Sequence, residues 1–118
     1  MSLNLIFDIK NNSEHIEFKD IMDFISEHYA YRETAFSNGV GEDIVINKPG
    51  ENAGSCRIFA FAQLNALSKE ETLACFGRYY RDDVLGNPEG RDHANIRTFM
   101  RYGWPGIKFE GVPLTAKS

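Results

Sequence analysis

The segment over residues 56–67 constrains the fold of this chain more than any other, because nearly all of its side chains are apolar. Ser55 directly before it is a natural N-cap, so a helix is predicted to begin there. A helix that is apolar on nearly every side has to be covered on most of them. We therefore expect this helix at the centre of the core, with Phe59 and Phe61 buried.

Four further helices are predicted from apolar side chains that recur at helical spacing. They cover the segment before residues 11–13, residues 18–29, the segment between Ser68 and residues 86–88, and the segment between Asp92 and Gly103. Ser68 and Glu71 stand at the spacing of a capping box, and Asp92 can cap the last helix. The chain is therefore expected to be predominantly helical, with about five helices.

After residue 30 the helical period disappears, and the pattern favours short strands. Side chains alternate over residues 31–36, and a β-branched run follows at 44–46. These features predict a small hairpin or two short strands, and residues 107–110 predict a final short strand. Because the strands do not alternate with helices in βαβ units, we expect an α+β fold, a small single domain over residues 1–118.

The charge balance and the absence of long apolar segments exclude several classes of partner. The chain has 13 Lys and Arg residues against 17 Asp and Glu residues, for a net charge of −4. A binder of nucleic acid or of an anionic membrane surface needs a basic footprint, so we expect neither partner. No stretch approaches the roughly 18 apolar residues of a membrane span. The N-terminus lacks a basic region and is interrupted by Asp8, so we expect no Sec signal peptide and a cytoplasmic protein.

Cys56 is the one candidate nucleophile that composition and motifs leave. Its thiol would stand at a helix start, where unpaired N–H groups and Arg57 favour the thiolate and lower the pKa. The alternative is that Cys56 packs in the core as a small apolar residue, which is also what we expect of Cys75. A thiol enzyme needs a base, and His93, with Asn95 two residues later, is the best-placed histidine in sequence order. The alternative, which the predicted helix favours, is that His93 is a solvated or hydrogen-bonding residue in the first turn of that helix.

A dense polar cluster lies on either side of the turn at residues 86–88. Its members are Tyr79, Tyr80, Arg81, Asp82, Asp83, Arg91, Asp92 and His93. They fit a carboxylate-lined site that binds a ligand or a divalent cation. Alternatively, they form Arg–Asp pairs that clamp the turn between two helices.

Two other segments have both a functional and a structural interpretation. Residues 48–55, which include Asn52 and Ser55, have glycines before a helix as phosphate-binding loops do, but they lack the Gly-Lys-Ser/Thr order. Trp104 is either an exposed recognition residue or, as a lone tryptophan after a helix usually is, a core residue. Metalloprotease, nucleophile-elbow and dinucleotide motifs are absent from the sequence, so we expect no metal and no cofactor.

Nearly the whole chain carries residue combinations that are similar to those of one bacterial protein family. They include Gly54-Ser55-Cys56-Arg57, Tyr79-Tyr80-Arg81-Asp82-Asp83 and Gly103-Trp104. In these segments, and most strongly from residue 52 to residue 114, the sequence resembles the HopJ type III effector family. The resemblance brings no family catalytic residues to this chain.

The resemblance implies an effector or cytosolic interaction protein that acts by binding a protein or a small ligand. Its partner would be a host protein or the type III secretion machinery, through which it would be exported. The candidate binding residues are Asn52, Ser55, Arg57, Tyr80, Arg81, Asp82, Asp83, Asn95 and Trp104. The alternative is a thiol-dependent enzyme with Cys56 as nucleophile and His93 as base, and a pocket that contains both would favour it.

Overall fold

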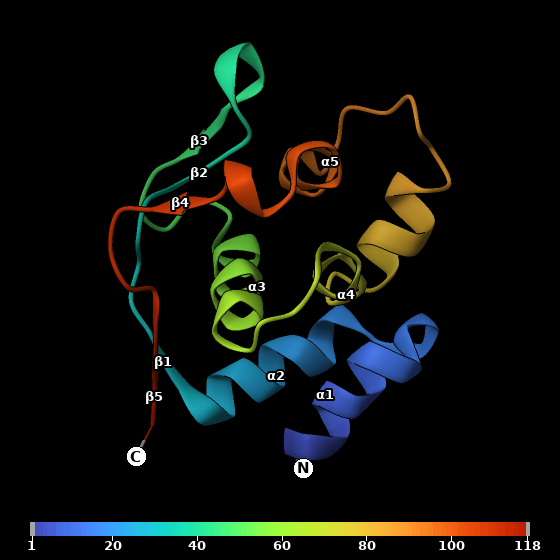
Figure 1. Ribbon diagram of the computed structural model, residues 1–118, viewed down its shortest axis with the longest axis vertical. Helices are drawn as coiled ribbons and strands as arrows, with labels where there is room; N and C mark the ends of the chain where they lie inside the picture. The colour runs from blue at the N-terminus through green and yellow to red at the C-terminus, as the bar shows by residue number, and fades with distance from the viewer. Residues whose placement is uncertain (1, 118) are drawn as a thin grey trace.

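Helix α3 (Ala53–Leu64) lies at the centre of the molecule, and the other elements surround it (Figure 1). In this computed structural model, which describes residues 2–117, Ile58, Phe59 and Phe61 have no exposed surface. The ring of Phe59 packs against four other aromatic rings, those of Phe36, Phe76, Phe99 and Trp104. The central, buried position predicted for this helix is confirmed.

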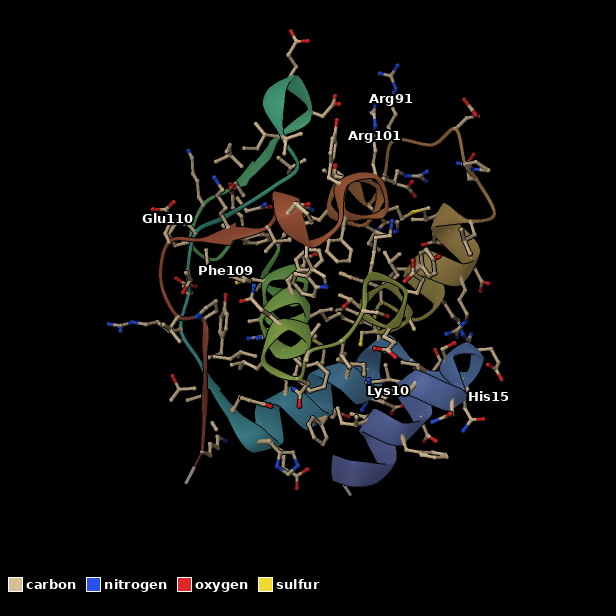
Figure 2. All side chains as sticks on the ribbon, in the orientation of Figure 1. Lys10, His15, Arg91, Arg101, Phe109 and Glu110 are labelled. Carbon is tan, nitrogen blue, oxygen red and sulfur yellow. The ribbon has the colours of Figure 1, made fainter. Side chains whose placement is uncertain are left out.

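The rest of the helical part consists of four other α-helices and several shorter helical turns. The helices are α1 (Ser2–Asn11), α2 (Phe18–His28), α4 (Lys69–Ala74) and α5 (Ala94–Tyr102), and the turns are η1 (Ser13–His15), η2 (Gly41–Asp43), the π-helical η3 (Tyr79–Val84) and η4 (Trp104–Gly106). The α1 helix is tied to the body of the fold by an ion pair of 3.2 Å between Lys10 (Figure 2) and Glu71 of α4. In the described part of the chain, no helix is long and apolar enough to span a membrane.

The strands form two small antiparallel sheets along one side of the helices. They are β1 (Tyr29–Tyr31), β2 (Phe36–Asn38), β3 (Val45–Asn47), β4 (Lys108–Phe109) and β5 (Leu114–Ala116). One sheet pairs β1 with β5, and the other has the order β3-β2-β4. The expected hairpin is formed by β2 and β3, in a register that places Phe36 opposite Asn47. The helix-rich α+β fold expected from the sequence is confirmed.

The boundaries of β2 differ from the prediction. The alternation over residues 31–36 predicts a strand there, but only the two ends of this segment are in strands, Tyr31 in β1 and Phe36 in β2, and β2 continues to Asn38. Asn38 is fully buried beside the core, which holds it in the sheet. The β5 strand is not predicted, because a three-residue edge strand has no pattern of its own.

The helix predicted from Ser68 to the turn at 86–88 is interrupted at Gly77. Its start is confirmed, since Ser68 and Glu71 form a capping box at α4. Gly77 then takes a φ of +60°, and a Cβ atom there would lie 2.6 Å from the backbone nitrogen of Phe18. The close approach of this distant segment therefore ends the helix, and the chain resumes as η3.

Candidate functional site

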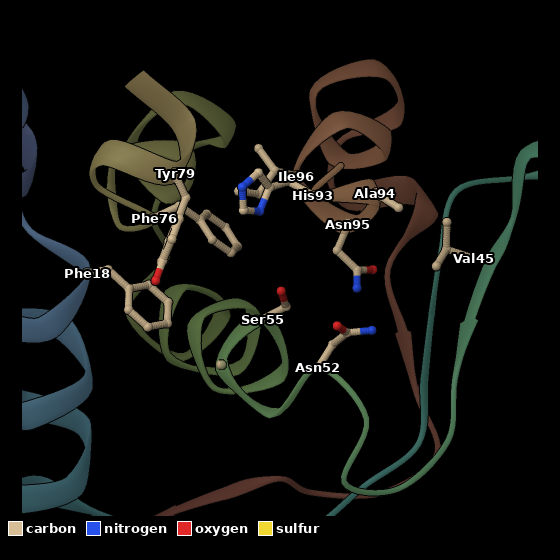
Figure 3. Close-up of a pocket in the computed structure, with 11 residues that line it drawn as sticks. Phe18, Val45, Asn52, Ser55, Phe76, Tyr79, His93, Ala94, Asn95 and Ile96 are labelled. Atoms are coloured by element: carbon tan, nitrogen blue, oxygen red, sulfur yellow. The ribbon is translucent and has the colours of Figure 1, made fainter. Parts of the chain in front are cut away.

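A cleft of about 430 Å³ opens between the first turns of α3 and α5 (Figure 3). Its polar side chains are Asn52, Ser55, His93 and Asn95. Its aromatic wall is formed by Phe18, Phe76 and Tyr79. A concave site with an aromatic wall and a few convergent polar groups is the usual form of a small-molecule site.

Both helices at this cleft begin differently from what the sequence predicts. The N-cap of α3 is Asn52 and not Ser55, and the N-cap of α5 is His93 and not Asp92. Both caps have a left-handed backbone, with φ of 50° and 53°. The predicted caps are therefore wrong, because Ser55 belongs to the first turn of α3 and the carboxylate of Asp92 is held by Arg97 at 2.6 Å.

Neither N-cap side chain caps its own helix. Asn52 donates its amide to Asn47 Oδ1 at 2.7 Å, and His93 Nε2 lies 3.0 Å from Asp83 Oδ2. The first backbone hydrogen bonds of α3 and α5 are donated by Cys56 and Arg97. The N–H groups of residues 53–55 and 94–96 precede these bonds, and such groups carry the partial positive charge of a helix N-terminus.

A buried asparagine network holds the two helix starts side by side. Asn47, which is 1% exposed, accepts a hydrogen bond from Asn95 Nδ2 at 3.0 Å and donates one to Asn95 Oδ1 at 3.3 Å. Asn47 also accepts the bond from Asn52, so one side chain joins the start of α3 to the start of α5. Asn38 donates to the backbone oxygen of Asn95 at 2.8 Å.

Sequence reasoning identified Asn52 and Asn95 but missed Asn38 and Asn47. A signal for them exists, because in a strand every second residue faces the same side. Asn38 shares a face with the buried Phe36 and is itself fully buried. A polar residue on the buried face of a short strand is therefore the pattern that would have indicated this network.

Cys56 does not line this cleft and is 1% exposed. Its thiol donates to the backbone oxygen of Thr34 at 3.7 Å. Burial raises the pKa of Cys56 to about 11, and the nearby Arg57 offsets only part of this effect. The predicted lowering of this pKa is wrong, because the helix begins at Ala53 and the backbone N–H of Cys56 is already bonded within it.

The structure does not bring the thiol and the candidate base together. His93 lines the cleft and pairs with Asp83, whereas Cys56 is not part of the cleft lining and its thiol donates to the backbone oxygen of Thr34. Cys75 is fully buried, as expected, and burial raises its pKa to about 12. Neither cysteine is placed for nucleophilic chemistry with a histidine base.

The polar cluster around residues 80–93 divides into parts with different roles. Arg81 turns away from the cleft and donates to the backbone oxygen of Ile16 at 2.6 Å, which ties η3 to the end of η1. Tyr80 is half-buried and packs against the core. Asp82 is exposed and lies outside the cleft lining.

An Arg–Asp clamp does hold the turn, but its arginine is Arg97, which sequence reasoning did not select. Arg97 bonds Asp92 Oδ1 at 2.6 Å and the backbone oxygen of Asn87 at 2.9 Å. Beside this clamp, one ligand atom each from Asp83, Asp92 and His93 lies within 4.8 Å of the others. A divalent cation at this point would compete with Arg97 for Asp92.

Arg57 and Trp104, two of the candidate binding residues, lie outside the cleft. Trp104 is half-buried against the rings of Phe59 and Phe99 and donates its indole N–H to the backbone oxygen of Leu67 at 3.1 Å. It is a core residue and not an exposed recognition residue. Arg57 lies over the ring of Tyr31, 4.2 Å from its centroid.

Comparison with known proteins places the chain in one family. The model of the family described as HopJ type III effector protein matches residues 3–114. The crystal structure described as unknown function protein VPA0580 is 50% identical in sequence and superposes with a TM-score of 0.94, covering 99% of this chain and 94% of that one. No curated protein matches the chain.

Proposed function

The chain belongs to the HopJ type III effector protein family, and we propose that it acts by binding a small molecule in the cleft between α3 and α5. The observation that carries this proposal is the convergence of two helix N-termini, both without side-chain caps, on one cleft of about 430 Å³. A cleft of this size accommodates a ligand with a single ring and a polar group.

The first turns of α3 and α5 select for a hydrogen-bond acceptor on the ligand. Their unpaired backbone N–H groups are donors, and the helix dipoles favour negative charge at the same point. Ser55 and His93 stand beside these groups and add side-chain hydrogen bonds. The ligand group that meets them is therefore a carbonyl, carboxylate or phosphate oxygen.

The aromatic wall selects for a flat apolar portion on the same ligand. Phe18 and Tyr79 meet edge to face with ring centroids 5.1 Å apart, and Tyr79 lies 5.2 Å from the His93 ring. Gly54 lets Phe18 approach α3, because a Cβ atom on Gly54 would lie 2.8 Å from Phe18 Cζ. Contacts with aromatic edges and faces stabilise a bound ring by dispersion and burial.

Binding is favoured over thiol catalysis by the placement of Cys56. A nucleophilic cysteine needs an accessible thiolate, and this thiol is buried with a pKa raised to about 11. The histidine proposed as its base already pairs with Asp83 in the cleft. The thiol enzyme therefore lacks both an accessible nucleophile and a base in contact with it.

Matched probes test the binding proposal. Isothermal titration of benzoate, which carries a ring and a carboxylate, is expected to give saturable binding with a Kd on the order of 1 mM. Benzylamine has the same ring with a cation and is expected not to bind. Ser55→Leu fills the cleft and abolishes benzoate binding, whereas Gln63→Leu at the exposed far end of α3 leaves it unchanged. Equal binding of both probes, or no effect of Ser55→Leu, contradicts the proposal.

Delivery through a type III apparatus is the second part of the proposed function, and it rests on the description of the family. The expected partner at that stage is the secretion machinery, and after delivery a host protein. The described part of α1 packs against the fold through Ile9, which is 1% exposed. Export through a narrow apparatus therefore requires α1 to detach first.

A further inference from the structure

A second cleft, of about 470 Å³, lies between α2, β1, Arg57 of α3 and Lys117. It is separate from the cleft between α3 and α5, with which it shares no lining residue. Its charged side chains are Asp23, Arg57 and Lys117. The balance of these three charges determines whether the cleft favours an anionic or a cationic ligand.

Arg57 differs from the other half-buried arginines in its partner. Within residues 2–117 the half-buried arginines are Arg57, Arg81 and Arg97. Arg81 lies 3.7 Å from a carboxylate oxygen of Glu17, and Arg97 lies 2.6 Å from one of Asp92. For Arg57, no described carboxylate lies within 4.0 Å, and its partner is the ring of Tyr31 at 4.2 Å. A half-buried cation without an anion is destabilised by its lost hydration.

The Arg57 guanidinium lies over the ring of Tyr31, and no described protein group accepts a hydrogen bond from it. Cation–π contact uses the face of the guanidinium, whereas its planar fork of N–H donors stays available. The Tyr31 hydroxyl is buried and has no partner among the described residues, so the contact to Arg57 depends on the ring alone.

The other charges among the described lining residues leave the cleft positive. Lys117 donates from Nζ to the backbone oxygen of Ser26 at 2.9 Å, and its backbone N–H bonds the oxygen of His28 at 2.9 Å. These bonds hold a second cation at the cleft. The carboxylate of Asp23 pairs with Lys19, whose Nζ lies 2.7 Å away, so the two cations of the cleft outnumber its one carboxylate. The cleft is therefore basic, although the chain as a whole has a net charge of −4.

We propose that this second cleft binds the oxyanion group of a ligand, a carboxylate or a phosphate, through Arg57 and Lys117. The fork of Arg57 matches two oxygens of such a group with parallel hydrogen bonds. Lys117 adds a point charge at the same cleft. The oxyanion supplies the partner that Arg57 lacks within the described chain, and the site is independent of the proposed function of the first cleft.

Titration of the native protein with inorganic phosphate, and separately with acetate, tests the site by NMR of the arginine Nε–Hε groups at constant ionic strength. The Arg57 signal and the Lys117 amide are expected to shift saturably. Arg57→Gln should weaken binding by about tenfold or more, and Arg57→Lys should weaken it less, because charge remains and the fork is lost. Arg101→Gln, which changes an exposed arginine paired with Asp43, should have no effect.

Two further variants keep the test decisive if Arg57→Gln fails to fold. Tyr31→Phe keeps the ring and should bind as the native protein does, whereas Lys117→Gln at the exposed chain end should weaken binding severalfold. A response to phosphate alone assigns a phosphate group, and a response to both anions assigns carboxylates as well. A linear shift shared by all arginines, or equal binding by Lys117→Gln and the native protein, overturns the proposal.

Discussion

Replacement of Asn47 by Ala tests the role of the asparagine network in holding the two helix starts together. The side chain of Asn47 is 1% exposed and accepts hydrogen bonds from Asn95 at 3.0 Å and from Asn52 at 2.7 Å. It also donates to Asn95 Oδ1 and to the backbone oxygen of Phe36, both at 3.3 Å. Asn47→Ala removes all of these bonds at once.

The expected loss of stability depends on whether water can replace the hydrogen bond that each partner of Asn47 loses. Asn52 is exposed, so water can replace its lost bond. Asn95 is 5% exposed and loses the acceptor that its Nδ2 group bonds. A hydrogen bond contributes about 1 kcal/mol and an unsatisfied buried amide costs about 1–3 kcal/mol, so Asn47→Ala should lower the free energy of unfolding by roughly 2–4 kcal/mol. That is a large part of the roughly 5–15 kcal/mol that stabilises a domain.

Urea denaturation followed by the fluorescence of Trp104 measures this loss. Asn52→Gly is the matched control, because it removes one of the same hydrogen bonds at an exposed residue and tolerates the φ of 50°. The control should lose less than about 1 kcal/mol. If Asn47→Ala also lost less than about 1 kcal/mol, the two helix starts would be held together by other contacts.

Further predictions follow from the buried thiols, the capping box and the family. Burial raises the pKa of Cys56 to about 11 and that of Cys75 to about 12. Iodoacetamide at neutral pH should therefore modify neither cysteine until urea is added. Modification of Cys56 in the native protein would instead support the thiol-dependent enzyme. The backbone N–H of Ser68 holds the pKa of Glu71 below its usual value. The ionised Glu71 carboxylate contributes its full stabilisation above the pKa that Glu71 has in the unfolded chain, and this contribution is lost as the pH falls through the pKa of Glu71 in the folded protein. The difference in unfolding free energy between wild type and Glu71→Gln should therefore become smaller in acid. A difference that stays constant with pH would contradict this. A reporter fused to the full chain should be translocated by an effector-injecting strain and not by its apparatus-null twin, and equal signals from both would contradict delivery.

The features that the sequence predicts are those that depend on neighbouring residues. The apolar helix over residues 56–67 and the capping box of Ser68 and Glu71 need no distant information, and both are confirmed. The break at Gly77 depends on the backbone of Phe18, which is far away in sequence. Such a contact leaves no local pattern except a glycine inside a helical period.

In the candidate site, too, the sequence indicates what depends on neighbouring residues and misses what depends on distant contacts. Asn52, Ser55, His93 and Asn95 are singled out in the sequence, and the fold brings them into one cleft. Cys56 is singled out because Ser55 looks like the cap, and the actual start at Ala53 places the thiol one turn further on and in the core. The actual N-cap, Asn52, bonds Asn47 of β3, and this contact depends on a strand register that no local signal gives.

The most direct test of the central claim is a map of backbone amide shifts during titration with benzoate. Binding in the cleft should shift the amides of residues 53–55 and 94–96, because their N–H groups meet the carboxylate. The first-turn amides of α4 provide an internal control, since Glu71 N–H is already bonded to Ser68 Oγ at 3.1 Å and should not respond. Equal responses at all three helix starts, or none at α3 and α5, would contradict a binding function for this cleft.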